Sequence, residues 1–127
     1  MKKKILMIVL LMASMLQTAN AQGKAEIKFD KQTINLGTFP ESAGEKTATF
    51  TFTNTGDAPL IINQLVASCG CTTPDYDKKP IAPGQKGTIK VTYNGKGKFP
   101  GYFKKSITVR TNAATEMTRL YIEGTME

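Results

Sequence analysis

The sequence predicts an all-β domain built as a sandwich of two sheets, and three observations predict it. From Glu26 onward, apolar and polar residues alternate with a period of two, and no segment sustains the 3.6-residue period of a helix. Clusters of Gly, Pro, Asn and Asp separate the alternating segments at regular intervals. About seven such segments in about 100 residues is the strand count of an immunoglobulin-like β-sandwich.

The first 21 residues have the pattern of a signal peptide. Three lysines precede an apolar run at residues 5–16, and Ala19-Asn20-Ala21 supplies a cleavage site of small residues. The run is shorter than the roughly 20 apolar residues that span a membrane, and no cysteine at the cleavage point suggests lipid attachment. We therefore expect export to the periplasm or the outside, and one domain at residues 22–127 without a transmembrane span.

The charge of this mature chain is ordinary for a soluble surface. Loss of the three lysines at positions 2–4 lowers the formal net charge from +7 to +4. The densest basic cluster surrounds three aromatic residues and is interpreted as a solvated hairpin, with contact to an anionic polymer or lipid as the alternative. It consists of Lys96, Lys98, Lys104 and Lys105 around Phe99, Tyr102 and Phe103. We predict no nucleic-acid partner, because that function requires a basic stripe along one face.

The first half of the domain is expected to hold four strands. Short strands at residues 27–29 and 33–36 come first. The clearest strand is Lys46–Asn54, where Ala48, Phe50 and Phe52 point to one face and threonines point to the other. Residues 60–67 are nearly continuously apolar, so this strand is expected to be covered on both faces.

Three strands are expected in the second half. Their inward residues are Ile89, Val91 and Tyr93 at residues 87–93, Phe103, Ile107 and Val109 at residues 103–111, and Leu120, Ile122 and Gly124 at the end. The turns at residues 54–57, 80–84, 94–95 and 100–101 are expected to supply a positive φ or a proline-restricted φ. The chain has no tryptophan, so Phe, Ile, Leu and Val must form the core.

The only two cysteines, Cys69 and Cys71, lie one glycine apart at residues 68–74, Ser-Cys-Gly-Cys-Thr-Thr-Pro. Export favours a disulfide. A three-residue loop gives it about 1.6 kcal/mol of stabilisation, against about 3 kcal/mol for a 15-residue loop. Three hypotheses stay open: a bend of small residues that ends the preceding strand, a labile thiol–disulfide pair, and a soft-metal site such as one for Cu(I). Ser68, Gly70, Thr72 and Pro74 would support the bend, and Pro74 is expected to end the strand.

The neighbouring residues do not supply what a reactive thiolate or a metal site requires. A reactive thiolate requires an electropositive setting, and its neighbours Ser68, Thr72, Thr73 and Asp75 carry no positive charge. Zinc requires four ligands, so in a chain without histidine it would need Asp75, Asp77 or a second molecule.

The remaining motifs do not indicate catalysis. The absence of histidine removes Ser-His and Cys-His nucleophilic chemistry. The two glycines at residues 94–98 do not open a helix and are interpreted as a turn. Asp75 and Asp77 lie beside Lys78 and Lys79 and are interpreted as solvated carboxylates rather than an acid–base pair or a calcium site. We predict a protein without enzymatic activity and without a cofactor.

Five segments resemble a bacterial family of immunoglobulin-like domains of unknown function, number fifteen seventy-three. They are INLGTF at residues 34–39, FTFTNTGDAPLII at 50–62, SCGCTTP at 68–74, PIAPGQKGTIKVTY at 80–93 and GYFKKSITVRTN at 101–112. The resemblance implies a secreted or periplasmic sandwich similar to major-sperm-protein, PapD-like and ASPM/hydin domains, which mostly act as binding or scaffold modules. It brings no established reaction. Family members often show Asp-Phe-Gly where this chain has Asn35-Leu36-Gly37.

The sequence therefore predicts an exported, non-enzymatic binding or scaffold module. Its partner is expected to be another protein or an envelope component that docks on a strand edge or on end loops. The alternative is a thiol–disulfide redox or copper-handling role for Cys69 and Cys71.

Overall fold

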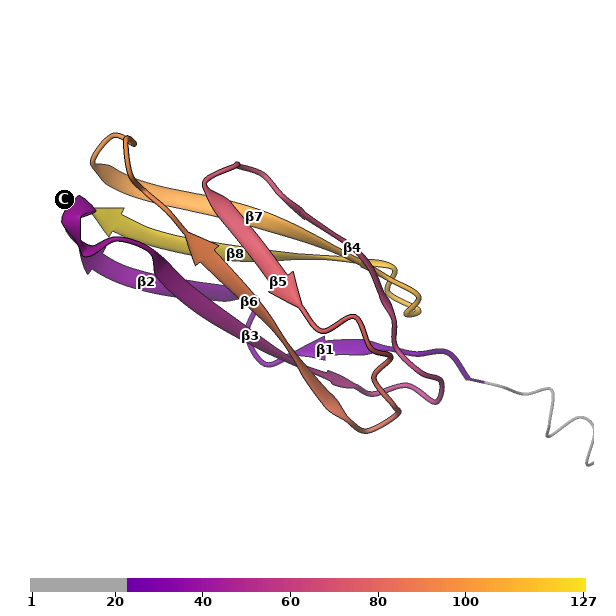
Figure 1. Ribbon diagram of the computed structural model, residues 1–127. Coiled ribbons are helices and arrows are strands. Elements are labelled where there is room, and N and C mark those ends of the chain that lie inside the picture. Colours follow the sequence, from indigo (N-terminus) through magenta and orange to yellow (C-terminus); the bar gives the residue numbers. More distant parts are fainter. Residues whose placement is uncertain (1–22) are drawn as a thin grey trace, which may run out of the picture.

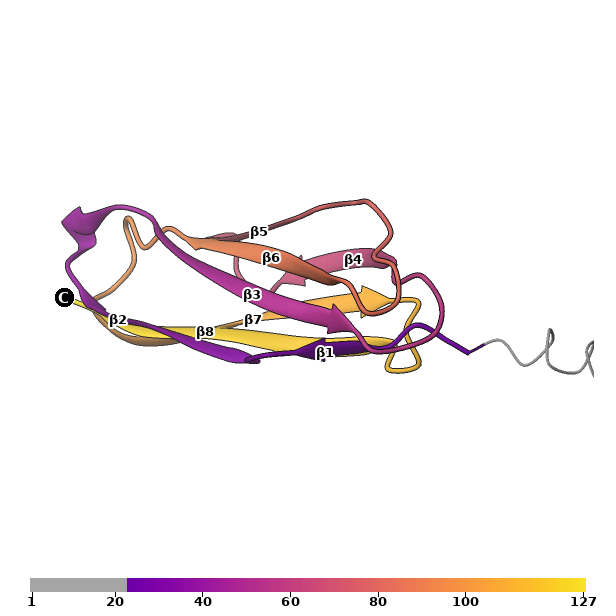
Figure 2. The ribbon, with the colours of Figure 1, turned by 90° about the horizontal axis from the view of Figure 1, so that it is seen from below.

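The computed structural model describes residues 23–127, so the predicted signal peptide at residues 1–21 lies outside the described residues. The described chain forms a β-sandwich of two four-stranded sheets (Figure 1). The two layers are seen from below in Figure 2, where β3 and β6 lie above β7 and β8. The elements are β1 (Ile27–Phe29), β2 (Thr33–Phe39), the 3-10 helix η1 (Glu41–Ala43), β3 (Lys46–Asn54), β4 (Ile62–Ala67), β5 (Thr72–Tyr76), β6 (Lys86–Tyr93), β7 (Gly101–Thr111) and β8 (Met117–Met126).

The strand orders are β1-β3-β6-β5 in the first sheet and β2-β8-β7-β4 in the second. All neighbouring strands are antiparallel except β2, which pairs in parallel with β8. The chain therefore changes sheet between β4 and β5, and both of these strands are edge strands. The all-β immunoglobulin-like prediction is confirmed. No helix within residues 23–127 is long and apolar enough to cross a membrane.

The core lies between the sheets and contains the side chains that the alternation placed inward. Phe50 and Phe52 of β3 are each 1% exposed, and Ile89 and Val91 of β6 are fully buried. Near the end of the sandwich where β8 finishes, the core is aromatic. Tyr93 stacks on Phe103 with ring centroids 4.1 Å apart, and Phe39 meets Phe103 edge-on at 5.9 Å. Aromatic pairs of this kind stabilise a core beyond their buried area.

The structure contains an eighth strand that the sequence did not indicate. Thr72–Tyr76 forms β5, so Pro74 lies inside a strand and the prediction that it ends one is wrong. Proline has no N–H for a sheet hydrogen bond and is tolerated because β5 lies at the sheet edge. The expectation that residues 60–67 are covered on both faces is also wrong. β4 is an edge strand whose Asn63, Gln64 and Val66 are exposed.

Two of the predicted turn glycines serve a different purpose from the expected one. Gly84 and Gly101 have positive φ values of 81° and 127°, as expected, but Gly56 and Gly95 do not have a positive φ. A Cβ on Gly95 would come within 2.6 Å of the Met126 sulfur, and one on Gly56 would clash with the backbone of residues 24–26. These two positions require glycine because the chain passes too close to its neighbours for a side chain.

Candidate functional site

The candidate site is the bend at residues 68–71, which carries the chain from β4 in one sheet to β5 in the other. The first residue of the bend, Ser68, is hydrogen-bonded to β7. The Ser68 amide donates to the Ser106 carbonyl (2.9 Å), and the Ser106 amide donates to the Ser68 hydroxyl oxygen (3.0 Å). The bend closes where the Thr72 amide donates to the Cys69 carbonyl (3.1 Å). The predicted bend is therefore present, and backbone hydrogen bonds hold its shape.

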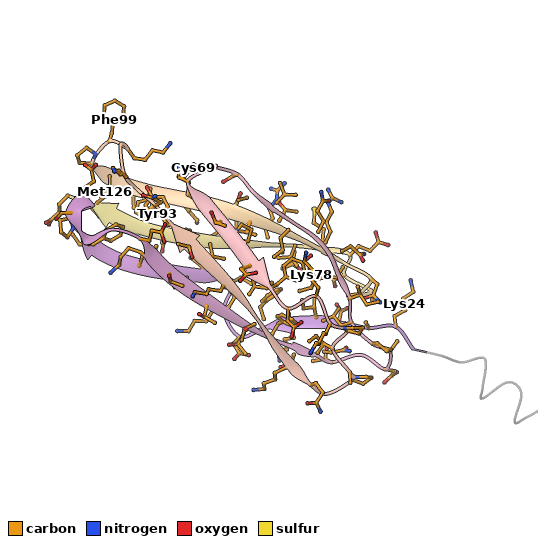
Figure 3. All side chains as sticks on the ribbon, viewed as in Figure 1. Lys24, Cys69, Lys78, Tyr93, Phe99 and Met126 are labelled. Carbon is orange, nitrogen blue, oxygen red and sulfur yellow. A yellow bond between two sulfur atoms is a disulfide. The ribbon has the colours of Figure 1, made fainter. Side chains whose placement is uncertain are left out.

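The far side of the bend is attached to the turn that follows β6. The Asn94 amide donates to the Cys71 carbonyl at 2.8 Å. In Figure 3 the labelled Cys69 lies on the same half of the molecule as Tyr93, Met126 and Phe99, whereas Lys24 lies at the opposite end. Gly70 points into open space, since nothing lies within 4 Å of the Cβ that it lacks. The bend therefore projects from the half of the sandwich that carries the β6–β7 turn.

Cys69 and Cys71 form a disulfide, with their Cα atoms 5.1 Å apart. The two sulfurs differ in their surroundings. Cys69 is partly exposed, whereas Cys71 is 8% exposed and belongs to the core. The Cys71 amide donates to Sγ of Cys69 at 3.2 Å, and the Thr72 hydroxyl lies 3.7 Å from Sγ of Cys71. The sequence interpretation considered only charged neighbours and missed this backbone donor, because an amide direction is invisible in a sequence.

The structure does not bring the acidic candidates together with the cysteines into a metal-binding group. Asp75 lies on β5 opposite Lys90, and the carboxylate of Asp77 accepts the amide of Lys79 at 3.0 Å. Both side chains are exposed, as predicted. Across residues 23–127, no three Cys, Asp or Glu side chains gather as a potential metal site. The copper hypothesis for the cysteines stays a prediction.

In the basic cluster near the β6–β7 turn, Lys96, Lys98 and Lys104 are exposed and Lys105 is partly exposed. Phe99 is 95% exposed and Tyr102 is 66% exposed, whereas Phe103 packs against the core. The Tyr102 hydroxyl donates to the Glu123 carboxylate at 2.8 Å, and this bond with the adjacent negative charge raises the pKa of Tyr102 above its usual value. Beside this turn, an open cavity of about 590 Å³ is lined by Glu41, Ser42, Gly44, Glu45, Asn94 and Lys96. Its two acidic residues offset the nearby lysines.

The four edge strands differ in how well they are protected against pairing with another chain. β1 is only three residues long. The pairing of β2 shifts register between Asn35 and Thr38, and β5 contains Pro74 and Asp75. Charge, proline, short length and irregular register are the usual means by which proteins prevent edge pairing. The pairing of β4 also shifts register, between Ile62 and Gln64, but residues 64–67 contain neither charge nor proline, and Val66 is 45% exposed there.

The free side of this edge carries unpaired backbone groups. Because the Ser68 amide bonds to β7, the alternation of an antiparallel ladder directs the amides of Leu65 and Ala67 away from β7. The sequence did not indicate this free edge of β4, because the pairing of strands decides which of them lies at an edge. The absence of charge and proline in residues 62–67 was the one signal that could have indicated it.

Comparison with known proteins places the chain among domains without an assigned activity. The profile of a family described as "Protein of unknown function (DUF1573)" matches residues 27–126. A comparison with curated proteins found no match.

Similar solved structures share the sandwich at low sequence identity. A protein of unknown function from Porphyromonas gingivalis W83 is 14% identical with a TM-score of 0.69, over 80% of this chain and 46% of that chain. The ASH/PapD-like domain 7 of human CEP192 is 10% identical with a TM-score of 0.64, over 82% of this chain and 87% of that one.

The Vibrio cholerae VesB protease is 17% identical with a TM-score of 0.61, and the match covers 80% of this chain but only 32% of the protease. The YadV chaperone and the periplasmic chaperone SfaE match with TM-scores of 0.57 and 0.55. These similarities show that the chain shares the fold of the proteins it matches. The chain spans less than half the length of the Porphyromonas protein and of the protease.

Proposed function

The chain belongs to the DUF1573 family of proteins of unknown function, and we propose that it is an exported, non-enzymatic module that binds an extended polypeptide segment along the edge of β4. The partner is another protein or an envelope component with an accessible extended stretch. The observation that carries this proposal is the unprotected edge at residues 64–67, which is uncharged and free of proline.

An extended polypeptide matches this edge in two ways. Its backbone carbonyls can accept from the outward amides of Leu65 and Ala67, so it would extend the four-stranded sheet by one strand. Its side chains would alternate between the faces of the sheet, where an apolar residue can contact Val66. The similarity to periplasmic chaperones supports a protein-binding role at the level of the fold.

A single charge on the edge tests the proposal. Val66→Lys places an ammonium group where an added strand would lie, so we expect at least about tenfold weaker partner binding, or roughly 1.4 kcal/mol. The matched control is Thr73→Lys, which adds the same charge to an exposed position on the β5 edge of the other sheet. Binding is measured by capture from a native envelope extract, with the retained partner then titrated against each variant.

Hydrogen exchange provides an independent measurement on the same samples. The amides of Leu65 and Ala67 should gain protection when the partner binds, because they become donors in a new ladder. Equal partner retention by Val66→Lys and Thr73→Lys, or protection confined to the end loops, would place binding elsewhere. Substrate turnover that depends on a polar side chain of residues 23–127 would contradict the non-enzymatic part of the proposal.

A further inference from the structure

We propose that the Cys69–Cys71 disulfide is an exchange centre that oxidises a pair of neighbouring thiols on an exported polypeptide or small dithiol. This activity goes beyond the binding role and does not depend on the β4 edge. Three features of the bend support this proposal. The bend keeps its shape without the disulfide, the two cysteines differ in exposure, and nearby hydrogen-bond donors can stabilise the reduced sulfurs.

The bend does not depend on the disulfide for its shape. The amide–carbonyl bonds of Ser68 to Ser106, Thr72 to Cys69 and Asn94 to Cys71 hold both of its sides. A disulfide stabilises a fold mainly by closing a loop in the unfolded chain, and a loop of three residues contributes only about 1.6 kcal/mol. Breaking this bond therefore leaves the sandwich folded.

The two cysteines differ in exposure, since Cys69 is partly buried against the margin of the core and Cys71 lies within it, and this difference gives exchange a preferred direction of attack. Cys69 is partly exposed on a bend that projects beside Gly70, whereas Cys71 is 8% exposed and packs in the core. An incoming thiolate therefore reaches Sγ of Cys69 first. Attack forms a bond between the incoming sulfur and Cys69 and breaks the Cys69–Cys71 bond, and Cys71 leaves as a thiolate that takes up a proton.

The second step completes a two-electron transfer. A second thiolate of the substrate attacks the substrate sulfur attached to Cys69, forming the substrate disulfide and releasing Cys69 as a thiolate. The substrate dithiol is oxidised and the Cys69–Cys71 disulfide is reduced, with no further reagent required. A substrate with two thiols close together is needed because the mixed disulfide is otherwise reversed by Cys71.

The groups around the sulfurs favour the reduced product, which makes the pair an oxidant. The Cys71 amide donates to Sγ of Cys69 at 3.2 Å and can stabilise negative charge on the released thiolate. The Thr72 hydroxyl lies 3.7 Å from Sγ of Cys71 and is available to the second sulfur. A stabilised reduced form is what makes a disulfide strongly oxidising. The chain has no further cysteine, so exchange is confined to this pair.

The first experiment locates the attacked sulfur. The oxidised mature protein is incubated with reduced glutathione, quenched with acid, and its adducts are mapped by mass spectrometry. We expect the adduct on Cys69 to exceed that on Cys71 by about tenfold. The single-cysteine variants give the same comparison, since Cys69 in Cys71→Ser should react with an aromatic disulfide probe about tenfold faster than Cys71 in Cys69→Ser. Equal adducts, or a preference for Cys71, would overturn the proposal.

The second experiment measures oxidation itself. One equivalent of the oxidised protein should convert a reduced peptide carrying two neighbouring cysteines to its disulfide, with matching loss of the Cys69–Cys71 bond. One equivalent of a peptide with one cysteine should give no net oxidation, because Cys71 reverses the mixed disulfide. No transfer to the dithiol peptide would refute the activity. This assay contains only the protein and a short dithiol peptide and needs no partner on the β4 edge, so a failure of this proposal is distinguishable from a failure of the binding proposal.

Discussion

Asn54 connects several segments at the end of the sandwich away from the cysteine bend. It is fully buried, and its side chain makes four hydrogen bonds. The amide nitrogen donates to the carbonyls of Ala58 (2.8 Å) and Ile81 (2.9 Å), and the carbonyl oxygen accepts from Glu26 (3.3 Å) and Gly56 (3.0 Å). One side chain therefore joins the N-terminal segment, the turn after β3 and the segment before β6.

Asn54→Ala should lower the free energy of unfolding by about 2–4 kcal/mol, because several buried backbone groups lose their partner together. Urea unfolding followed by circular dichroism measures the loss. The control is Asn63→Ala on β4, where an exposed side chain is removed and a change within about 0.5 kcal/mol is expected. A loss below about 1 kcal/mol at Asn54 would mean that water replaces these hydrogen bonds without cost.

Among the strands, β3 has one face packed in the core and one face exposed to solvent. Its pairing with β6 places Phe50 opposite Ile89 and Phe52 opposite Gly87, all facing the core. A Cβ on Gly87 would lie 2.5 Å from the Phe52 ring, so the glycine provides the space that this ring occupies. The alternating threonines at positions 47, 49 and 51 pair with Thr92, Lys90 and Thr88 on the outer face. The two faces should therefore respond differently to mutation.

Phe52→Ala should cost roughly 3–5 kcal/mol of unfolding free energy, because the cavity lies between two sheets that cannot close around it. Thr49→Ala on the outer face of the same strand should change the unfolding free energy by less than about 1 kcal/mol. Denaturant titration of both variants measures the difference. Similar losses for the two variants would contradict the role of β3 as a strand with one buried face.

For the whole molecule, stability comes from two sheets that bury one continuous core, and the disulfide is a small addition to it. The core extends from Ala25 at the start of the described chain to Met126 near its end. Cys71 occupies one margin of this core, and the disulfide joins residues only two positions apart. It therefore connects no two elements that are distant in the chain.

Replacing both cysteines by serine should consequently lower the unfolding free energy by no more than about 2 kcal/mol. Unfolding curves of the oxidised protein, the reduced protein and Cys69→Ser/Cys71→Ser test this, and the reduced protein should resemble the double variant. A loss above about 3 kcal/mol would show that the disulfide is a main support of the fold. That result would also weaken the exchange proposal, because the reduced state would then be partly unfolded.

The fold class and most of the core follow from the amino-acid sequence alone. The period-two alternation of β3, β6, β7 and β8 specifies which side chains face inward, because a strand places alternate residues on opposite faces. It also indicated the bend at residues 68–71, since two cysteines around a glycine can form a disulfide only where the chain turns. These are local properties, and each depends on residues that are near one another in the chain.

The positions of the edge strands and the surroundings of each sulfur are known only from the folded structure. The apolar run in β4 indicated a covered strand, yet its position is set by its pairing with β7, about 45 residues away in the chain. Pro74 indicated a strand end, but an edge position tolerates it. The amide that points at Sγ of Cys69 likewise depends on the direction of the backbone in the folded bend. An edge position is a relation between distant segments, and a donor direction depends on the backbone conformation of the bend. Alternation along one segment encodes neither.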